Sequence, residues 1–209
     1  MKNARERVRG LGPSRRELKC FHKLGNVPAN VLHELSALSK TDQNDLGTDD
    51  YSLPSNFDLA NTFNVKNQQY RQVLFQKAKH DPSSELEYSN WEPGLIETRK
   101  YLSTYFQQVY RFRLSIMEPN HHIPWHIDTD TSISCRAQIC LNATRSVFMW
   151  KTKEGIEELR MNVGDLYFIN TGWSHTVIGG AEVREVAIFG FQFSDLDPKH
   201  QQKLRHDVP

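Results

Sequence analysis

Cysteine is scarce in this sequence. Three occur among the 209 residues, Cys20, Cys135 and Cys140, and no two of them form a C-x-x-C pair. So small and odd a number excludes a disulfide framework, and the spacing excludes a structural zinc knuckle. We therefore expect reduced, partly buried thiols without a chemical role, and a cytoplasmic location, because thiols stay reduced in that compartment.

Long hydrophobic runs and a surplus of charge are also missing. No apolar stretch approaches the roughly 20 residues that a membrane helix needs. The first residues, MKNARERVRG, have no apolar stretch behind their charges, so we expect no secretory signal there. The formal net charge of +1 gives no general attraction to nucleic acid or to a membrane surface. The expected partner is instead a substrate, either a small molecule or a peptide or protein.

What is present is the composition of a globular protein, with 38% hydrophobic and 24% charged residues. A chain of 209 residues can bury a substantial core as one domain. Residues 1–19 are basic and are interrupted by Gly10, Gly12 and Pro13, which predicts a flexible arm. We assign residues 20–209 to a single domain.

The pattern of apolar residues changes along the chain. Pro28 to Leu38 and Pro93 to Phe106 have the spacing of amphipathic helices, residues 40–64 have the composition of a loop, and residues 66–79 are ambiguous. Several closely spaced short strands predict a β-sandwich or barrel, so we expect a mainly β fold whose core spans about 110–195, behind a helical N-terminal region. The predicted strands cover 110–118, 124–128, 133–141, 146–151, 156–161, 165–170, 175–178 and 184–193.

A histidine and an aspartate stand two residues apart at His126 and Asp128, and His175 follows at the start of a later apolar run. On a strand, residues two apart point to the same face, so the first pair can reach one metal together. Two imidazoles and one carboxylate suit Fe(II) and leave its remaining positions open for a co-substrate and O₂. Other histidines more often lie on the surface or in hydrogen-bonded cores; they include His80, His121, His122 and His200.

Arg184 lies nine residues after His175, at the start of the strand predicted over 184–193. A guanidinium there can hold a carboxylate through two parallel hydrogen bonds. A dicarboxylate that binds iron at one end needs such a contact at its far end. The alternative is a surface arginine paired with Glu182 or Glu185.

Two further strands carry polar side chains on one face. Ser115 is a candidate second donor to the same carboxylate, and Arg113 shares its face and is a rival for that role. Arg136 and Gln138 alternate with apolar residues on the strand over 133–141. This polar face indicates either the lining of a barrel or a solvent-exposed side.

Taken together and in order, these pieces resemble the aspartyl/asparaginyl β-hydroxylase-like branch of the Fe(II)/2-oxoglutarate dioxygenases. That branch also includes bacterial hydroxylases of free amino acids such as proline. The resemblance covers a little under half the chain, from Arg113 to Pro198. The matching pieces are Ser115-Ile116-Met117 with Pro119 behind it, His126-x-Asp128, Arg136-x-Gln138-Ile139-x-Leu141, Val163-Gly164-Asp165, and His175 with Arg184.

The resemblance implies a double-stranded β-helix, a jelly-roll or cupin-like barrel. It implies that His126, Asp128 and His175 bind the iron, and that Arg184 and Ser115 hold the distal carboxylate of 2-oxoglutarate. Some members of the family lack the metal-binding carboxylate, whereas this chain has Asp128.

One residue departs from the family pattern. Arg136 matches the arginine of the family's R-x-H motif, but Gln138 stands where the family has the histidine, which lies near the co-substrate carboxylate next to the iron. A glutamine amide can donate a hydrogen bond but cannot carry a proton. The departure places the affinity and the pH response of co-substrate binding in question, not the binding itself.

The implied reaction consumes O₂ and 2-oxoglutarate, releases succinate and CO₂, and hydroxylates an unactivated C–H bond. Polar and aromatic residues near the expected mouth suit an amino acid, free or within a peptide or protein. Those residues are Arg113, Asn120, His121, Trp125, Asp130, Arg136, Asn170 and Trp173.

Two other functions remain open on the sequence. A non-catalytic barrel that binds a metabolite is favoured by Gln138, and a cupin-type metalloenzyme that does not use 2-oxoglutarate shares the same ligands. Fold alone does not decide between them. The sequence does not predict the oligomeric state.

Overall fold

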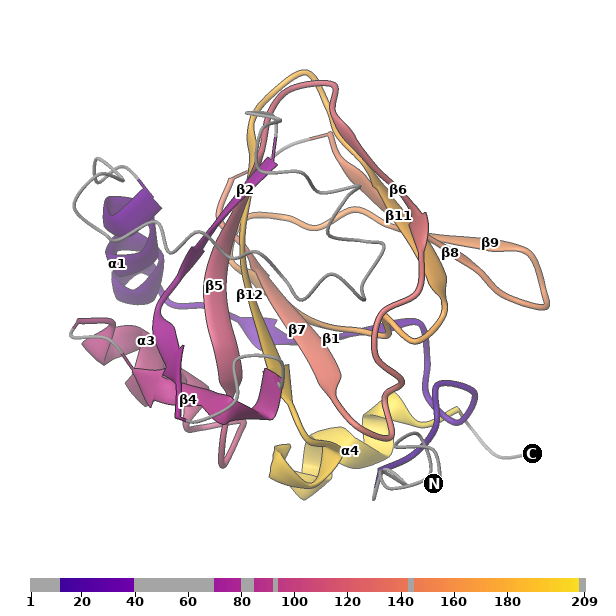
Figure 1. Ribbon diagram of the computed structural model, residues 1–209, viewed down its shortest axis with the longest axis horizontal. Helices are drawn as coiled ribbons and strands as arrows, with labels where there is room; N and C mark the ends of the chain where they lie inside the picture. The colour runs from indigo at the N-terminus through magenta and orange to yellow at the C-terminus, as the bar shows by residue number, and fades with distance from the viewer. Residues whose placement is uncertain (1–11, 40–69, 80–84, 92–93, 143–144, 207–209) are drawn as a thin grey trace, which may run out of the picture.

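The computed structural model describes residues 12–39, 70–79, 85–91, 94–142 and 145–206 (Figure 1). The predicted loop over 40–64 lies outside these ranges. The helices are α1 (Ala29–Ser39), α3 (Ile96–Leu102) and α4 (Pro198–Leu204), with short 3₁₀ turns at Glu85–Glu87 and Phe193–Asp195. The strands are β1 (Phe21–Asn26), β2 (Tyr70–Leu74), β3 (Gln76–Ala78), β4 (Tyr88–Trp91), β5 (Tyr110–Met117), β6 (His122–His126), β7 (Cys135–Cys140), β8 (Val147–Lys151), β9 (Ile156–Leu159), β10 (Asp165–Ile169), β11 (Ser174–Ile178) and β12 (Arg184–Phe191).

Two antiparallel sheets face each other. The larger has the strand order β1-β10-β7-β12-β5-β2, and the smaller has the order β6-β11-β8-β9. Figure 1 shows them as two walls, with β5, β12 and β7 in one and β6, β11 and β8 in the other. From β5 to β12 the chain passes back and forth between the two walls, with β8 and β9 as a hairpin within the smaller one. This is the arrangement of a double-stranded β-helix and confirms the predicted fold class.

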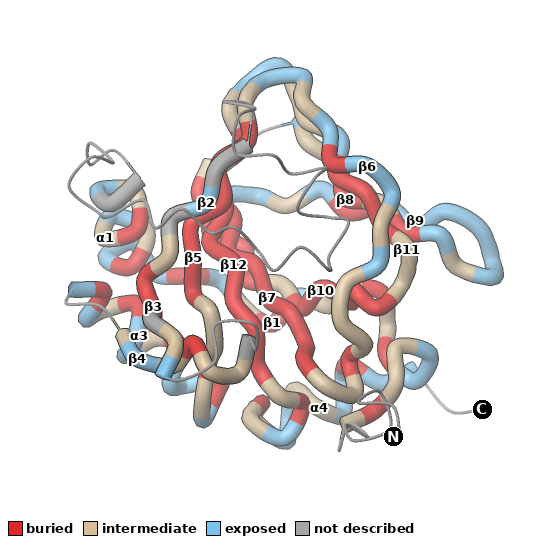
Figure 2. Tube along the Cα trace, viewed as in Figure 1, coloured by how far each residue is buried: buried red, intermediate tan, exposed pale blue. Residues whose placement is uncertain are grey.

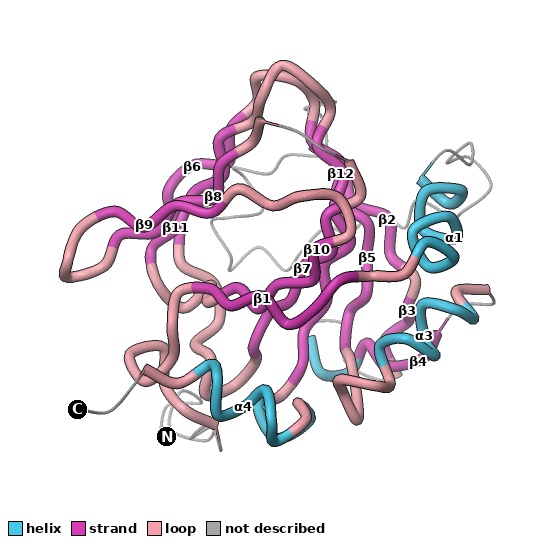
Figure 3. Tube along the Cα trace, turned by 180° about the vertical axis from the view of Figure 1, so that it is seen from behind, coloured by secondary structure: helices cyan, strands magenta, loops and turns pink. Residues whose placement is uncertain are grey.

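The outer face of the large sheet carries the main apolar core. Phe112 and Leu114 of β5 and Phe189 of β12 pack there with residues from α1, α3 and the C-terminal segment. In the view from behind, α1 and α3 lie together on one flank of this sheet and α4 lies at its end (Figure 3). The helices thus cover the sheet on the side away from the smaller wall.

The inner face of the large sheet has a different character. Apolar residues between the two sheets form a smaller cluster around Trp150 and Phe148 of β8 and Met117 of β5. Beside that cluster lie buried polar side chains of the large sheet, among them Arg113, Ser115, Arg136, Gln138 and Arg184. Because both faces of β5, β7 and β12 are covered, these strands are buried along most of their length (Figure 2).

Most predicted elements lie close to their expected positions, and the differences are local. The second predicted helix is shorter than expected, because α3 ends at Leu102 and Phe106 packs into the core after it. The ambiguous segment over 66–79 contains β2 and β3, and the elements β1, β4 and α4 were not predicted. No helix in the described ranges is long and apolar enough to span a membrane.

The described part of the N-terminal segment, residues 12–19, is packed against the barrel. Leu18 is completely buried and Leu204 accepts a hydrogen bond from the amide of Lys19. The structure here differs from the expectation of a flexible arm that extends to residue 19. Residues 1–11 of that predicted arm lie outside the described residues. All three cysteines are free and buried.

The carboxylate of Glu34 links α1 to the start of α3. One carboxylate oxygen of Glu34 accepts hydrogen bonds from the amide of Thr98 at 2.8 Å and from its hydroxyl at 2.6 Å, and the other accepts from the amide of Glu97 at 3.2 Å. These amides belong to the first turn of α3, whose N–H groups have no partners within the helix. Glu34 therefore caps α3 from outside.

Replacing Glu34 with alanine is expected to lower the free energy of unfolding by about 1–2 kcal/mol, the usual cost of losing a helix cap. Urea denaturation measures this. Burial acts to raise the pKa of Glu34, but the hydrogen bonds from Thr98 and Glu97 outweigh it and lower the pKa below its ordinary value. The charged form thus stabilises the fold above the ordinary glutamate pKa, and this contribution disappears as the pH falls through the lowered value. The stability gap between wild type and Glu34→Gln should accordingly narrow in acid, and a gap that widens there would contradict this account.

Candidate metal centre and co-substrate pocket

The three predicted metal ligands come together between the two sheets. His126 ends β6, and His175, near the start of β11, lies directly opposite it in the strand register. The two imidazole rings are 4.1 Å apart between centroids, and Nε2 of His126 lies 3.6 Å from a carboxylate oxygen of Asp128. One ligand atom from each of the three residues falls within 4.8 Å of the others.

Asp128 reaches this cluster in a different way from the one predicted. The sequence predicted a strand through residue 128, but β6 ends at His126 and Asp128 lies in the loop that follows. Its amide donates a hydrogen bond to the carbonyl of Thr171, in the loop between β10 and β11, at 3.0 Å. A contact with a second loop, not the alternation of a strand, therefore sets the position of the carboxylate.

The backbone fixes the orientation of both imidazoles. Nδ1 of His126 lies 2.8 Å from the carbonyl of Pro124, and Nδ1 of His175 lies 2.9 Å from the carbonyl of Trp173. A carbonyl only accepts hydrogen bonds, so the proton of each neutral ring is placed on Nδ1. Each Nε2 then keeps its lone pair for a metal ion, which is the usual way a supporting contact orients a metal-binding histidine.

His175 is held in its neutral form. Burial lowers its pKa to about 4, and the nearby charges of His126 and Arg136 act in the same direction, while the Asp128 carboxylate opposes them. A metal ion binds only the neutral imidazole. At neutral pH the ring therefore needs to lose no proton before it binds an ion.

This donor set fits Fe(II). Two imidazoles and one carboxylate on one side of an ion leave its other positions open, the pattern of non-haem iron oxygenases. Among the described residues, this is the one group of three or more His, Cys, Asp or Glu side chains whose donor atoms converge closely enough for one ion.

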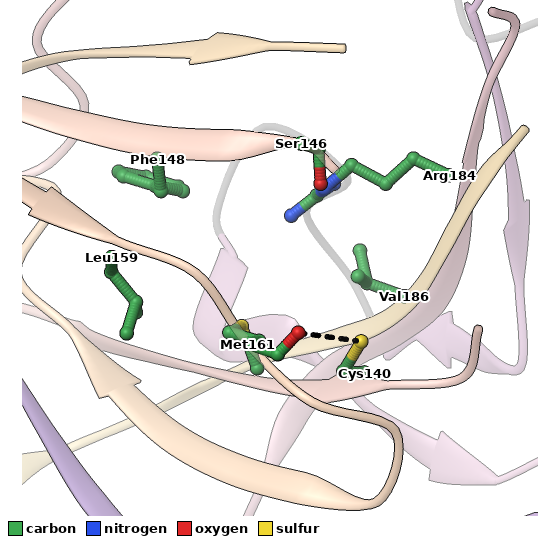
Figure 4. A pocket seen from close by; sticks show the side chains of 7 residues that line it. All are labelled: Cys140, Ser146, Phe148, Leu159, Met161, Arg184 and Val186. Atoms are coloured by element: carbon green, nitrogen blue, oxygen red, sulfur yellow. Dashed lines mark hydrogen bonds between the residues drawn. The ribbon is translucent and has the colours of Figure 1, made fainter. Parts of the chain in front are cut away.

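A pocket extends from beside this centre toward Arg184. Phe148 stacks on the ring of His175 with centroids 5.2 Å apart, and it also lines the pocket. In Figure 4 the guanidinium of Arg184 points into the pocket beside the hydroxyl of Ser146, above Val186. The remaining lining residues are Cys140, Leu159 and Met161. The pocket therefore has an aromatic wall next to the metal ligands and a cation at its far side.

The four predicted co-substrate residues lie on the inner face of the large sheet. Nη2 of Arg184 donates a hydrogen bond to the side-chain carbonyl of Gln138 at 3.0 Å, and both residues are buried. Ser115 lies across from Val186, which is two residues along β12 from Arg184 and on the same face. Arg136 lies further along the sheet, opposite Gly190, close enough to His175 for its charge to lower the pKa of that ring. The buried positions of Arg184 and Gln138 rule out the solvent-exposed alternatives.

Several residues that the sequence predicted at the mouth of the site lie elsewhere in the structure. Asn120 and His121 lie in the turn before β6, beside Gly179 and Gly180, at the end of β6 and β11 opposite the metal ligands. Asn170 is buried, and its side-chain amide donates to backbone carbonyls of residues 15, 18 and 19. Asn170 therefore has a structural role, and Asn120 and His121 lie away from the metal ligands.

The others stay nearer to the centre. Trp125, beside His126, is partly exposed and carries the ammonium of Lys151 at 4.3 Å from its ring centroid. Asp130 accepts a hydrogen bond from the amide of Ser132 in the loop after Asp128. Arg113 is buried on the inner face of β5, across from Ile188.

Sequence reasoning missed two kinds of supporting residue. Phe148 forms the aromatic wall and Trp150 stacks on it with ring centroids 4.4 Å apart, and the apolar alternation of the strand over 146–151 could have marked both. The carbonyls of Thr171 and Trp173 orient two ligands, but any residue supplies a carbonyl, so no sequence signal identifies them.

No family model and no curated protein matches the sequence. Solved structures do match. AviO1 from Streptomyces viridochromogenes Tue57 has a TM-score of 0.53 at 18% identity, over 93% of this chain and 95% of that one. A 2OG-Fe(II) oxygenase family oxidoreductase from Burkholderia pseudomallei has a TM-score of 0.54 at 12% identity, over 82% and 83%.

The fold is shared with a 2OG-Fe(II) oxygenase. A prolyl-4-hydroxylase from Pseudomonas putida gives the same result, with a TM-score of 0.51 at 11% identity over 83% of this chain and 92% of that one. Identities this low establish a common fold and do not carry over a substrate. They also do not reach the aspartyl/asparaginyl β-hydroxylase-like branch that the sequence resembles.

Proposed function

We propose that this protein is an Fe(II)- and 2-oxoglutarate-dependent dioxygenase that hydroxylates a C–H bond of an amino acid, free or within a peptide or protein. The observation that carries the proposal is the convergence of His126, Asp128 and His175, with both imidazoles oriented by backbone carbonyls. The fold shared with a 2OG-Fe(II) oxygenase supports it.

Each predicted residue has a role in this proposal. His126, Asp128 and His175 would hold Fe(II), which supplies the means to activate O₂ when it is bound. Arg184 would hold the distal carboxylate of 2-oxoglutarate, with Ser115 as a second donor. Such a dicarboxylate would lie along the wall formed by Phe148, which shields it from water.

The overall reaction balances with two co-substrates. One oxygen atom of O₂ enters the substrate as a hydroxyl group, and the other enters succinate as 2-oxoglutarate loses CO₂. The protein's own contribution is to position the reactants and to exclude water, since the redox chemistry belongs to the cofactor.

Arg136 and Gln138 complete the polar lining. Arg136 is buried on the inner face of β7, opposite Gly190, and there it would attract the co-substrate carboxylate next to the metal. Gln138 accepts from Arg184, which leaves its amide N–H₂ group as a donor. The amino-acid substrate rests on the sequence resemblance.

Anaerobic titration of the protein with Fe(II) and then 2-oxoglutarate tests the proposal. Chelation of the metal by 2-oxoglutarate is expected to give a charge-transfer absorption band. Metal binding without such a band would favour a cupin-type enzyme that does not use 2-oxoglutarate, and a band without any turnover would favour a metabolite-binding barrel. An untargeted search by mass spectrometry for the gain of one oxygen, in metabolites and in peptides, then identifies the substrate class.

A further inference from the structure

Residues 12–19 form a segment, here called the N-terminal strap, that crosses the base of the metal centre. The strap joins two loops that are far apart in the sequence. One is residues 170–173, between β10 and β11, and the other is residues 127–134, between β6 and β7. Each loop supplies or supports a metal ligand.

The strap is bound to the first loop by reciprocal contacts at Arg15. Its guanidinium donates a hydrogen bond to the carbonyl of Gly172 at 2.7 Å and lies 5.5 Å from the centroid of the Trp173 ring. In return, the Arg15 carbonyl accepts from the indole N–H of Trp173 at 3.0 Å and from the side chain of Asn170 at 2.9 Å. The side chain and the backbone of Arg15 thus grip the same loop.

Close packing adds to these hydrogen bonds. A Cβ atom placed on Gly172 would lie 2.9 Å from the Cβ of Arg15, so the strap and the loop are in direct contact there. The Asn170 amide also reaches the carbonyls of Leu18 and Lys19 at 3.3 Å each. The loop has no room to shift toward the strap.

The strap also holds the second loop. The carbonyl of Pro13 accepts a hydrogen bond from the hydroxyl of Thr131 at 3.0 Å, and the amide of Gly12 donates to the carbonyl of Ser132 at 3.1 Å. These residues follow Asp128 closely in the chain. The strap therefore contacts both the loop that holds the Asp128 amide and the residues that follow Asp128 in the chain.

The carbonyls that orient the ligands belong to the clamped loop. The Thr171 carbonyl accepts from the amide of Asp128, and the Trp173 carbonyl accepts from Nδ1 of His175. Both flank Gly172, which Arg15 holds directly. A displacement of the strap would therefore move the supports of two metal ligands at once.

We propose that the N-terminal strap is a positioning element of the metal centre, and that Arg15 is its principal positioning residue. This inference rests on the proposed metal site. Strap docking and metal binding are then linked, so each must favour the other by the same factor. Metal affinity and protection of the strap are two independent measurements of one coupling.

The first test is titration of the full chain with Co(II), without oxygen or 2-oxoglutarate, followed by visible absorption. Arg15→Ala is expected to weaken Co(II) binding about 10-fold, at the low end of the effect of losing a contact that supports a metal ligand. The matched control is Arg16→Ala, which removes the same charge from the exposed neighbouring residue and should leave the affinity unchanged.

A second variant disturbs the same contact without removing the charge of Arg15. Gly172→Ala brings a methyl group against Arg15 and should weaken Co(II) binding to a similar extent. If both variants act by releasing the strap, their effects will not add. The Co(II) Kd of the double variant will then be no higher than that of the single variant with the higher Kd. Fully additive losses would overturn the inference.

The reciprocal test uses limited trypsin digestion of the wild-type chain. Saturating Co(II) should slow cleavage after Arg15, Arg16 and Lys19, while cleavage after Lys153, in the exposed turn between β8 and β9, serves as the internal reference. Mass spectrometry of the fragments separates these sites.

The outcomes are distinct. If wild type binds Co(II) and Arg15→Ala binds it equally well, the strap has no positioning role, even if the metal-free variant melts at a lower temperature. If Co(II) fails to protect the strap, the linkage is refuted. If wild type itself binds no Co(II), the proposed metal centre fails, which is a different result.

Discussion

Replacing His126 with alanine is expected to abolish substrate-dependent release of succinate, and Asp128→Ala should do the same. Each change removes one of three side chains that converge within 4.8 Å, so two donors remain for an ion that would need three. Succinate formation, measured by mass spectrometry under saturating Fe(II) and 2-oxoglutarate, checks the prediction once a substrate is identified. Before then, the anaerobic 2-oxoglutarate band should be lost in both variants.

The control for this prediction is His33→Ala, which removes an exposed histidine from α1 and should retain full activity. Full activity of either ligand variant would refute the assignment of the metal centre. Loss of activity together with loss of folding would be recognised by circular dichroism and would require the milder variant Asp128→Asn, which preserves the size of the side chain.

Arg184→Ala is expected to raise the apparent Kd for 2-oxoglutarate about 30-fold while leaving Co(II) affinity largely unchanged. A hydrogen bond to a charged group contributes about 2 kcal/mol, and this energy corresponds to that factor. The guanidinium is buried at the far side of the pocket from the metal ligands, so its loss should act on the co-substrate alone. Anaerobic titration followed by the charge-transfer band measures both quantities in one experiment.

Two variants sharpen this prediction. Arg184→Lys keeps the charge but loses the forked geometry, so it should fall between wild type and alanine. Gln138→Glu places a carboxylate within hydrogen-bond distance of the guanidinium, where it competes with the co-substrate, and should weaken 2-oxoglutarate binding more than Gln138→Ala does. If Arg184→Ala binds 2-oxoglutarate as tightly as wild type, another cationic side chain on the inner face of the large sheet holds the distal carboxylate.

The β-structure was predictable because its strands carry local signals. Along β5 and β7, apolar residues alternate with polar ones that face the interior, and turns separate the strands clearly. β1 was missed because its alternation is weak: it contains Lys23 and Gly25 and is irregular where it pairs with β10. Its place is decided by pairing with a strand far along the chain, which a local pattern does not record.

The candidate site was predictable as far as side-chain chemistry reaches. The residues His126, Asp128, His175 and Arg184 were identified by type and spacing, and the structure brings the first three together. The local structure at Asp128 was predicted wrongly. The strand ends before this residue, and its amide donates a hydrogen bond to the Thr171 carbonyl instead. The strap was missed for the same reason: most of its contacts are made to or by the main chain.

The acceptors of the two imidazole protons are both main-chain carbonyls. A substitution at Pro124 or at Trp173 changes a side chain but leaves the carbonyl in the chain. The tautomers of the two candidate ligand rings are therefore insensitive to side-chain substitution at these positions, provided that the backbone path is kept. Side chains around the opening can change without altering which nitrogen of either ring carries the proton.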